Sequence, residues 1–194
     1  MILYGASGHG KVIADIFKKN GISDIVFWDD DINAKVSGYK VEKPLSIYDQ
    51  DRVVIAVGNN LVRKEIVAAN DFSYATAIHP KAIIAENVSI QEGTVVMAGA
   101  IVNPSTTIGK HCILNTSCSI DHDCQIEDYV HVSPNATLSG GVQVGEGSWI
   151  GAGATIIQGV SIGKWAIVGA GAVIIKDVPD NAVVVGNPGR VINN

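Results

Sequence analysis

The stretch from Ile108 to Leu138 reads IGKHCILNTSCSIDHDCQIEDYVHVSPNATL, and it decides the fold of this chain. A branched aliphatic residue begins the stretch and recurs at every sixth position. The same series runs without exception from Ile78 to Ile174, and a compact side chain stands four residues after each member. A period of six fits neither an α-helix of 3.6 residues per turn nor the two-residue alternation of a simple strand. It predicts a three-sided parallel β-helix, in which one aliphatic side chain per flat side points to the axis.

Residues 1–76 have a different pattern, in which strands alternate with helices. The expected order is a strand at residues 2–4, a helix that Gly21 ends, strands at residues 25–28 and 53–57, and a helix at residues 61–69. Such an order predicts a parallel sheet with crossover connections, which makes a small α/β, Rossmann-like unit. We therefore expect two domains, residues 1–76 and residues 77–194, with a closing strand at residues 182–185.

Composition and charge exclude several classes of protein. The chain is 47% hydrophobic and 17% charged, with a formal net charge of -5. This balance gives no overall basic surface for nucleic acid or anionic lipid and leaves a local basic patch as the alternative. No run of about 18 apolar residues is present, and the chain opens directly with a strand-like segment, so we expect no signal peptide, no membrane insertion and a cytoplasmic protein.

The three cysteines, Cys112, Cys118 and Cys124, stand six residues apart at the compact inward position of successive repeats. Successive repeats occupy different sides of the prism, so the thiols cannot gather around one ion. We predict inert thiols in the core rather than nucleophiles or metal ligands.

His122 is the strongest candidate for a catalytic residue because carboxylates flank it on both sides, at Asp121 and Asp123. It stands two residues after the inward Ile120 and should therefore point outward. A neighbouring carboxylate favours the protonated imidazole and raises its basicity. That property suits a general base. A solvated surface histidine is the alternative that these residues leave open.

A metal site built from histidines is not expected. Counting along the chain places His111 and His131 on the same side of the prism, one coil apart. The spacings of eleven and nine residues around His122 do not bring the three rings to one corner. A zinc site needs converging ligands, so we predict no metal.

The glycine-rich segment GASGHG, Gly5 to Gly10, joins the first strand to the first helix. Backbone amides at a helix N-terminus attract anionic groups, although a short glycine pattern is weak evidence alone. Asp29 and Asp30 close the next strand, and Gly58 begins the turn after the third. Three loops at the carboxyl edge of one parallel sheet predict a nucleotide-type site, with tight turns as the alternative.

Outward aliphatic residues on the prism, such as Val95, Ile101 and Ile113, predict association. Three prisms packed around a threefold axis would cover these flat apolar sides. A monomer with scattered surface aliphatics is the alternative.

The tandem hexads resemble those of hexapeptide acyltransferases, which are left-handed parallel β-helices that act as trimers with acetyl-CoA. This resemblance is narrowed by the segments GASGHGK, FWDD, AVGNN followed by Arg63, and ILNTSCSIDHDCQIEDYVHVSPNATLSGGV. Together they look like the nucleotide-4-aminosugar N-acetyltransferases and sialic-acid O-acetyltransferases, and most like the bacillosamine-pathway N-acetyltransferases. The resemblance covers the whole chain.

The resemblance implies a role for particular residues. His122 matches the catalytic base, and Asp123 matches the acidic residue that sharpens its basicity, where relatives often have Glu. His131 and the backbone near Ala152 and Ala170 match positions that contact acetyl-CoA. The residues that match contacts to the nucleotide sugar are Ser7, Gly8, His9, Asp29, Asp30 and Gly58.

The reaction implied is direct transfer of acetyl from acetyl-CoA to the 4-amino group of a UDP-linked 4-amino-dideoxy sugar, with His122 as general base. No metal takes part, and the expected assembly is a homotrimer with active sites between subunits. Two alternatives stay open. One is O-acetylation of sialic acid or another sugar on the same fold, and the other is a non-enzymatic trimeric scaffold that binds nucleotide sugars.

Overall fold

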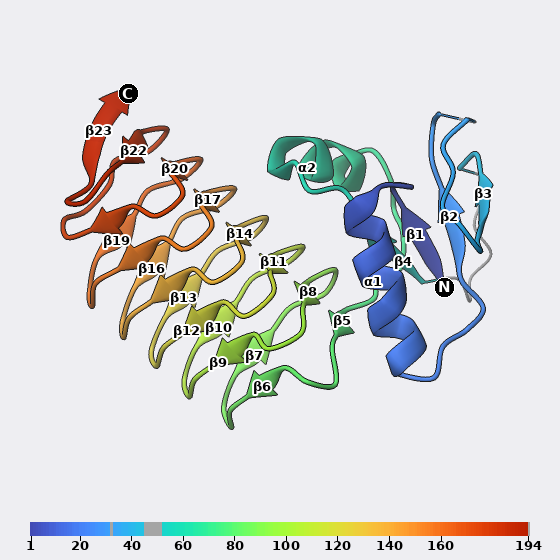
Figure 1. Cartoon of the computed structure of the whole chain (residues 1–194), viewed down its shortest axis with the longest axis horizontal. Helices are drawn as coiled ribbons and strands as arrows, with labels where there is room; N and C mark the ends of the chain where they lie inside the picture. Colours follow the sequence, from blue (N-terminus) through green and yellow to red (C-terminus); the bar gives the residue numbers. More distant parts are fainter. Residues whose placement is uncertain (32, 45–51, 194) are drawn as a thin grey trace.

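A computed structural model describes residues 1–31, 33–44 and 52–193, and it places two units one after the other along the long axis (Figure 1). The N-terminal unit is a parallel sheet with strand order β3-β2-β1-β4. Its strands are β1 (Ile2–Tyr4), β2 (Val26–Trp28), β3 (Lys40–Glu42) and β4 (Val53–Ile55), and its helices are α1 (Gly8–Lys19) and α2 (Asn60–Ala68). The predicted α/β unit is therefore present.

Packing inside the N-terminal unit explains two differences from the sequence prediction. Helix α1 begins at Gly8, inside the glycine-rich segment, with Ser7 at the N-cap position. A Cβ at Gly10 would lie 2.5 Å from the Gly5 carbonyl oxygen and 2.7 Å from the Phe27 ring, so only glycine fits there. Strand β3 is an additional edge strand. Its three residues carry no strong apolar pattern, and pairing with β2 alone defines it.

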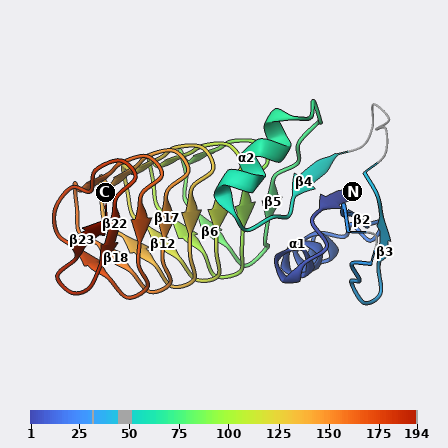
Figure 2. The same ribbon diagram turned by 90° about the horizontal axis from the view of Figure 1, so that it is seen from above.

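The second unit is a prism of two-residue strands that stack into three parallel sheets, here called the first, second and third sides (Figures 1 and 2). The first side contains β5 (Ala77–Ile78), β8 (Val95–Val96), β11 (Ile113–Leu114), β14 (His131–Val132), β17 (Trp149–Ile150) and β20 (Ile167–Val168). The second side contains β6 (Ile83–Ile84), β9 (Ile101–Val102), β12 (Ser119–Ile120), β15 (Thr137–Leu138), β18 (Thr155–Ile156) and β21 (Val173–Ile174). The third side contains β7 (Ser89–Ile90), β10 (Thr107–Ile108), β13 (Gln125–Ile126), β16 (Gln143–Val144) and β19 (Ser161–Ile162).

Paired strands lie 18 residues apart, as in Ile113 opposite His131, so the predicted three-sided parallel β-helix is confirmed. The second residue of nearly every strand points to the axis and is buried, and the compact residues fill the corners. Burial raises the pKa of the Cys112 and Cys118 thiols to about 12, which keeps them protonated. All three cysteines are buried, as predicted.

Each corner turns through one residue with positive φ, three positions after the inward aliphatic residue. This holds at every corner from Asn87 to Gly171, and at His111, Tyr129 and Trp165 the residue is bulky. Such residues rarely adopt this conformation. The closure of the coil therefore imposes it, rather than local preference.

Hydroxyl groups at some compact corner positions link one coil to the next. The Ser148 Oγ donates to the Gly163 carbonyl at 2.6 Å and accepts from the Ala166 amide at 2.9 Å. Thr94 and Thr106 make equivalent pairs of bonds. These three side chains are almost fully buried, and their hydrogen bonds make that burial favourable.

The C-terminal end of the prism is closed by a hairpin of β22 (Val183–Val185) and β23 (Arg190–Asn193). Strand β22 continues the first side by pairing with β20 in parallel, as the sequence predicts for residues 182–185. The two chain ends lie at opposite ends of the molecule (Figure 2). Within the described ranges, the helices are all too short or too polar to span a bilayer.

The N-terminal unit covers the beginning of the first side of the prism. Val95 and Ile113 are each 1% exposed and share one apolar cluster with Leu3, Ile13 and Phe27. The expectation that these two residues need a neighbouring prism is therefore wrong, because the chain covers them itself. Ile83 on the second side and Trp149 on the first stay uncovered, at 62% and 49% exposed.

Candidate active site between the N-terminal unit and the prism

Three loops of the N-terminal unit meet at the carboxyl edge of its sheet because β1 lies between β2 and β4. The Ala6 amide donates to Asp29 Oδ2 at 2.7 Å, and the Tyr4 hydroxyl donates to Asp30 Oδ2 at 3.1 Å. Gly5 has a φ of +122°, and a Cβ there would lie 2.7 Å from the Ala56 carbonyl oxygen. The residues assigned to the nucleotide sugar from the sequence therefore gather around one edge.

The N-terminus of α1 is open at this edge. Ser7 and Gly8 are exposed, and among the described residues no neighbouring atom lies within 4 Å of the space that a Cβ on Gly8 would occupy. The Ser7 side chain makes no capping hydrogen bond to the helix. An anionic group can therefore approach the first amides of α1.

Arg63 fastens α2 to the prism. Its side chain is 1% exposed, and burial lowers its pKa to about 10. The guanidinium donates five hydrogen bonds, to the carbonyls of Val57, Gly58, His111 and Tyr129 and to Asn60 Oδ1. Two of these acceptors belong to the prism, so the position of the loop from Gly58 to Asn60 is set by contacts with both units.

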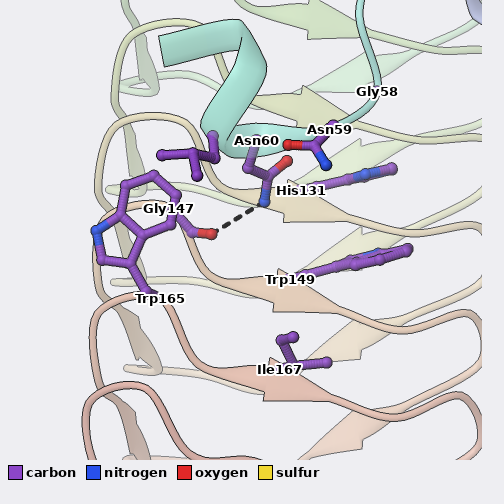
Figure 3. A pocket seen from close by; sticks show the side chains of 9 residues that line it. Gly58, Asn59, Asn60, His131, Gly147, Trp149, Trp165 and Ile167 are labelled. Atoms are coloured by element: carbon purple, nitrogen blue, oxygen red, sulfur yellow. Dashed lines mark hydrogen bonds between the residues drawn. The ribbon is translucent and has the colours of Figure 1, made fainter. Parts of the chain in front are cut away.

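A pocket of about 480 Å³ lies between this loop and the first side of the prism (Figure 3). The residues that line it are Gly58, Asn59, Asn60, Leu61, His131, Gly147, Trp149, Trp165 and Ile167. Asn60 Nδ2 donates to the Gly147 carbonyl at 3.0 Å and so pins the loop to one wall. His131, Trp149 and Ile167 stand on three successive strands and form the other wall. The pocket is thus predominantly apolar with a few polar groups at one end, as in many sites for organic ligands.

His131 is held as a neutral imidazole. Burial, followed by the charge of Arg63, lowers the pKa of His131 to about 3. Asn115 Oδ1 accepts from the Thr116 amide at 2.8 Å, so its Nδ2 is the donor to His131 Nε2 at 3.1 Å. The ring proton is therefore assigned to Nδ1. The ring also stacks on Trp149, with centroids 5.9 Å apart and planes 7° from parallel.

His9 lies in the first turn of α1 and is also held neutral. Its burial, together with the charge of Arg63, lowers the pKa of His9 to about 4. Its Nε2 is buried, and among the described residues it has no hydrogen-bond partner. A buried polar atom without a partner suits a place that a ligand completes.

His122 lies at the corner between the second and third sides, and its side chain is 60% exposed. Its Nδ1 is 2.7 Å from Asp123 Oδ2. The pKa of His122 is raised, first by this hydrogen bond and then by the charge of Asp121. Because the carboxylate accepts the Nδ1 proton, Nε2 carries the free lone pair. This arrangement fits a general base.

The structure brings the predicted residues together only in part. His131 and Gly58 line the pocket, and Ala152 and Ala170 are exposed at the corner between the first and second sides. His122 is at a different corner, across the prism from the first side. Within one chain, the candidate base and the pocket are therefore apart.

The counting that placed His111 and His131 on one side of the prism is wrong. His131 pairs with Ile113, whereas His111 lies in the preceding corner, 2% exposed and stacked on Tyr129. Across the part of the chain that the structure describes, no group of three or more His, Cys, Asp or Glu side chains is placed to hold a metal ion.

Sequence reasoning assigned no role to several residues of the site, above all Arg63, Asn60 and the two tryptophans. Trp149 occupies the outward strand position, where most repeats have a smaller residue, and that departure was a usable signal. Arg63 follows the AVGNN segment on which the family resemblance partly rests, but its structural role depends on carbonyl groups 48 and 66 residues away and so could not be read from the sequence.

Comparison with solved structures finds proteins of the same architecture. The acetyltransferase domain of PglB from Neisseria gonorrhoeae FA1090 is 39% identical in sequence, with a TM-score of 0.94 and 98% of each chain covered. This chain belongs to the same family of sugar N-acetyltransferases. The family member perosamine N-acetyltransferase from Caulobacter crescentus, solved as a histidine-to-asparagine mutant with CoA and GDP-perosamine, is 32% identical with a TM-score of 0.91. That match covers 100% of this chain and 96% of the other.

Sequence comparisons agree with this family. The PglD N-terminal domain matches residues 1–69, and the hexapeptide repeat of bacterial transferases matches residues 105–140 and 141–176. The UDP-N-acetylbacillosamine N-acetyltransferase of Bacillus subtilis (strain 168) is 41% identical over 108 residues, and this match covers half of each chain. The PglB acetyltransferase domain has also been solved with acetyl coenzyme A.

Proposed function

We propose that the chain transfers acetyl from acetyl-CoA to the 4-amino group of a UDP-linked 4-amino-dideoxy sugar in the cytoplasm. Residues 1–76 would bind the nucleotide sugar, and residues 77–194 would carry the transfer. The observation on which this depends is the His122–Asp123 pair, which presents a free Nε2 lone pair to solvent. The relatives that act on UDP-N-acetylbacillosamine and GDP-perosamine support the substrate class.

The proposed chemistry is a direct transfer. The amine nitrogen attacks the thioester carbonyl, the carbon–nitrogen bond forms and the carbon–sulfur bond then breaks. His122 Nε2 takes the proton that the nitrogen loses and then passes it to the departing CoA sulfur, which leaves as the thiol. The neutral His131, with its proton on Nδ1, supplies a donor for the carbonyl oxygen on which charge develops.

The nucleotide is proposed to lie at the carboxyl edge of the N-terminal sheet. The diphosphate suits the open N-terminus of α1 at Ser7 and Gly8, with His9 Nε2 beside it. Asp29 and Asp30 follow β2, where a carboxylate can accept from a ribose hydroxyl. Acetyl-CoA would run along the first side from His131 past the small residues Ala152 and Ala170.

A homotrimer with active sites between subunits is part of the proposal. His122 lies across the prism from the pocket, so a single chain cannot bring its base to its own pocket. A neighbouring prism that presents its His122 to the first side of this chain would complete the site. The exposed Trp149 and the 42% exposed Ile167 on that side favour such packing.

The test is a substrate screen with purified protein. Acetyl-CoA is mixed with UDP-4-amino sugars, GDP-4-amino sugars or sialic acid, and release of the CoA thiol is followed. We expect turnover with a UDP-4-amino sugar and a loss of about 10²–10⁴-fold in kcat for His122→Ala. Turnover with sialic acid alone would instead establish an O-acetyltransferase. Binding of a nucleotide sugar without any turnover would establish a scaffold.

A further inference from the structure

Gly140 lies one coil beyond His122 at the same corner of the prism, and its backbone faces the imidazole. A Cβ at position 140 would lie 2.7 Å from both Cε1 and Nε2 of His122, and 3.3 Å from Nδ1. Unbonded carbon atoms rest at about 3.5–4.0 Å, so 2.7 Å is a clash. The imidazole therefore occupies space that is free only because residue 140 has no side chain.

The turn itself does not require this glycine. Gly141, the next residue, has a φ of +70°, but Gly140 does not have a positive φ. Steps of 18 residues along this corner place Glu86, Pro104, His122 itself and Gln158 at the same position in the other coils. The corner thus accepts larger side chains at this position, and His122 is the specific reason for glycine at 140.

The remaining contacts hold the ring from its other sides. Asp123 Oδ2 lies 2.7 Å from Nδ1, at the edge away from Nε2. The His122 amide donates to Asp121 Oδ1 at 2.8 Å, and Asn103 Nδ2 donates to the same oxygen at 2.9 Å. These contacts orient the backbone and Nδ1 of His122, and Gly140 determines how closely the Nε2 edge can approach the next coil.

We propose that Gly140 is a positioning residue for the catalytic base, because it lets the His122 ring lie against the next coil while Nδ1 keeps its bond to Asp123. This inference rests on the proposed role of His122. An alanine would push the ring outward by about 0.8 Å or more, from 2.7 Å to an ordinary contact distance of about 3.5 Å. The ring is exposed and can move at little cost to the stability of the fold. The substitution should therefore change the position of Nε2 and weaken the hydrogen bond between Nδ1 and Asp123.

The experiment compares Gly140→Ala with Gln158→Ala, which changes the same corner position one coil further on. For Gly140→Ala we expect kcat/KM to fall by about 10–100-fold, since a misplacement near 1 Å can have that effect. The NMR-measured pKa of His122 should also fall as its bond to Asp123 weakens, with the melting temperature unchanged within about 2 °C. Gln158→Ala should leave all three quantities unchanged.

A double-mutant cycle separates positioning from a general structural effect. In a His122→Ala background, Gly140→Ala should lower the residual rate by less than about twofold, since there is no ring left to displace. If Gly140→Ala lowers the rate by the same factor with and without His122, the proposal is overturned. An unchanged pKa of His122 in the Gly140→Ala variant also overturns it. The pKa measurement needs no substrate, so it decides the role of Gly140 even if the screen for acetyl transfer fails.

Discussion

Replacement of Arg63 tests whether its five hydrogen bonds hold the N-terminal unit on the prism. Each such bond contributes about 1 kcal/mol net. Arg63→Ala should therefore lower the free energy of unfolding by about 4–5 kcal/mol, and Arg63→Lys by about 2 kcal/mol, because an ammonium group has three donors rather than five. For a chain of this size, about 1 kcal/mol corresponds to 2–4 °C in melting temperature.

The assay is thermal unfolding combined with hydrogen exchange of α2. We expect Arg63→Ala to melt about 10–15 °C lower, with faster exchange in α2, and Arg63→Lys to lie between it and the unmodified chain. Glu65→Ala is the matched control, because Glu65 is an exposed residue of the same helix. If Arg63→Ala melts within about 3 °C of the control, the hydrogen bonds of Arg63 do not hold the N-terminal unit on the prism.

Three further outcomes follow from the structure. Asp123→Asn removes the largest of the influences that raise the pKa of His122, so the ascending limb of kcat/KM against pH should move to lower pH, with a loss of about 100-fold near pH 7. An unmoved limb would show that Asp123 is not the main influence on this pKa. Ser148→Ala leaves two buried backbone groups without partners and should lower the free energy of unfolding in urea by about 1–3 kcal/mol. Burial lowers the pKa of His111 to about 4, below its unfolded value. The contribution of neutral His111 to stability is therefore present above about pH 6.5 and is lost as the pH falls toward 4. His111→Asn should flatten this dependence of the free energy of unfolding on pH.

The catalytic candidates differ in how far sequence reasoning could reach them. His122 and Asp123 are adjacent in the chain, and the hexad register already directs them outward, so their pairing could be predicted. The neutral state of His131 could not, because burial beneath the N-terminal unit and the charge of Arg63 cause it. The same contact between units buries Val95, which the sequence presented as a free apolar surface.

The sequence by itself determined the prism, because a strict six-residue period leaves only one way to bury every aliphatic residue along a common axis. It also determined the α/β character of the first unit, through short apolar strands that alternate with amphipathic helices. Only the tertiary structure decided where the pocket lies and which corner holds the candidate base. Those positions depend on how the N-terminal unit docks on the first side, through hydrogen bonds from Arg63 to backbone carbonyls of the prism. No sequence pattern identifies which carbonyls these are.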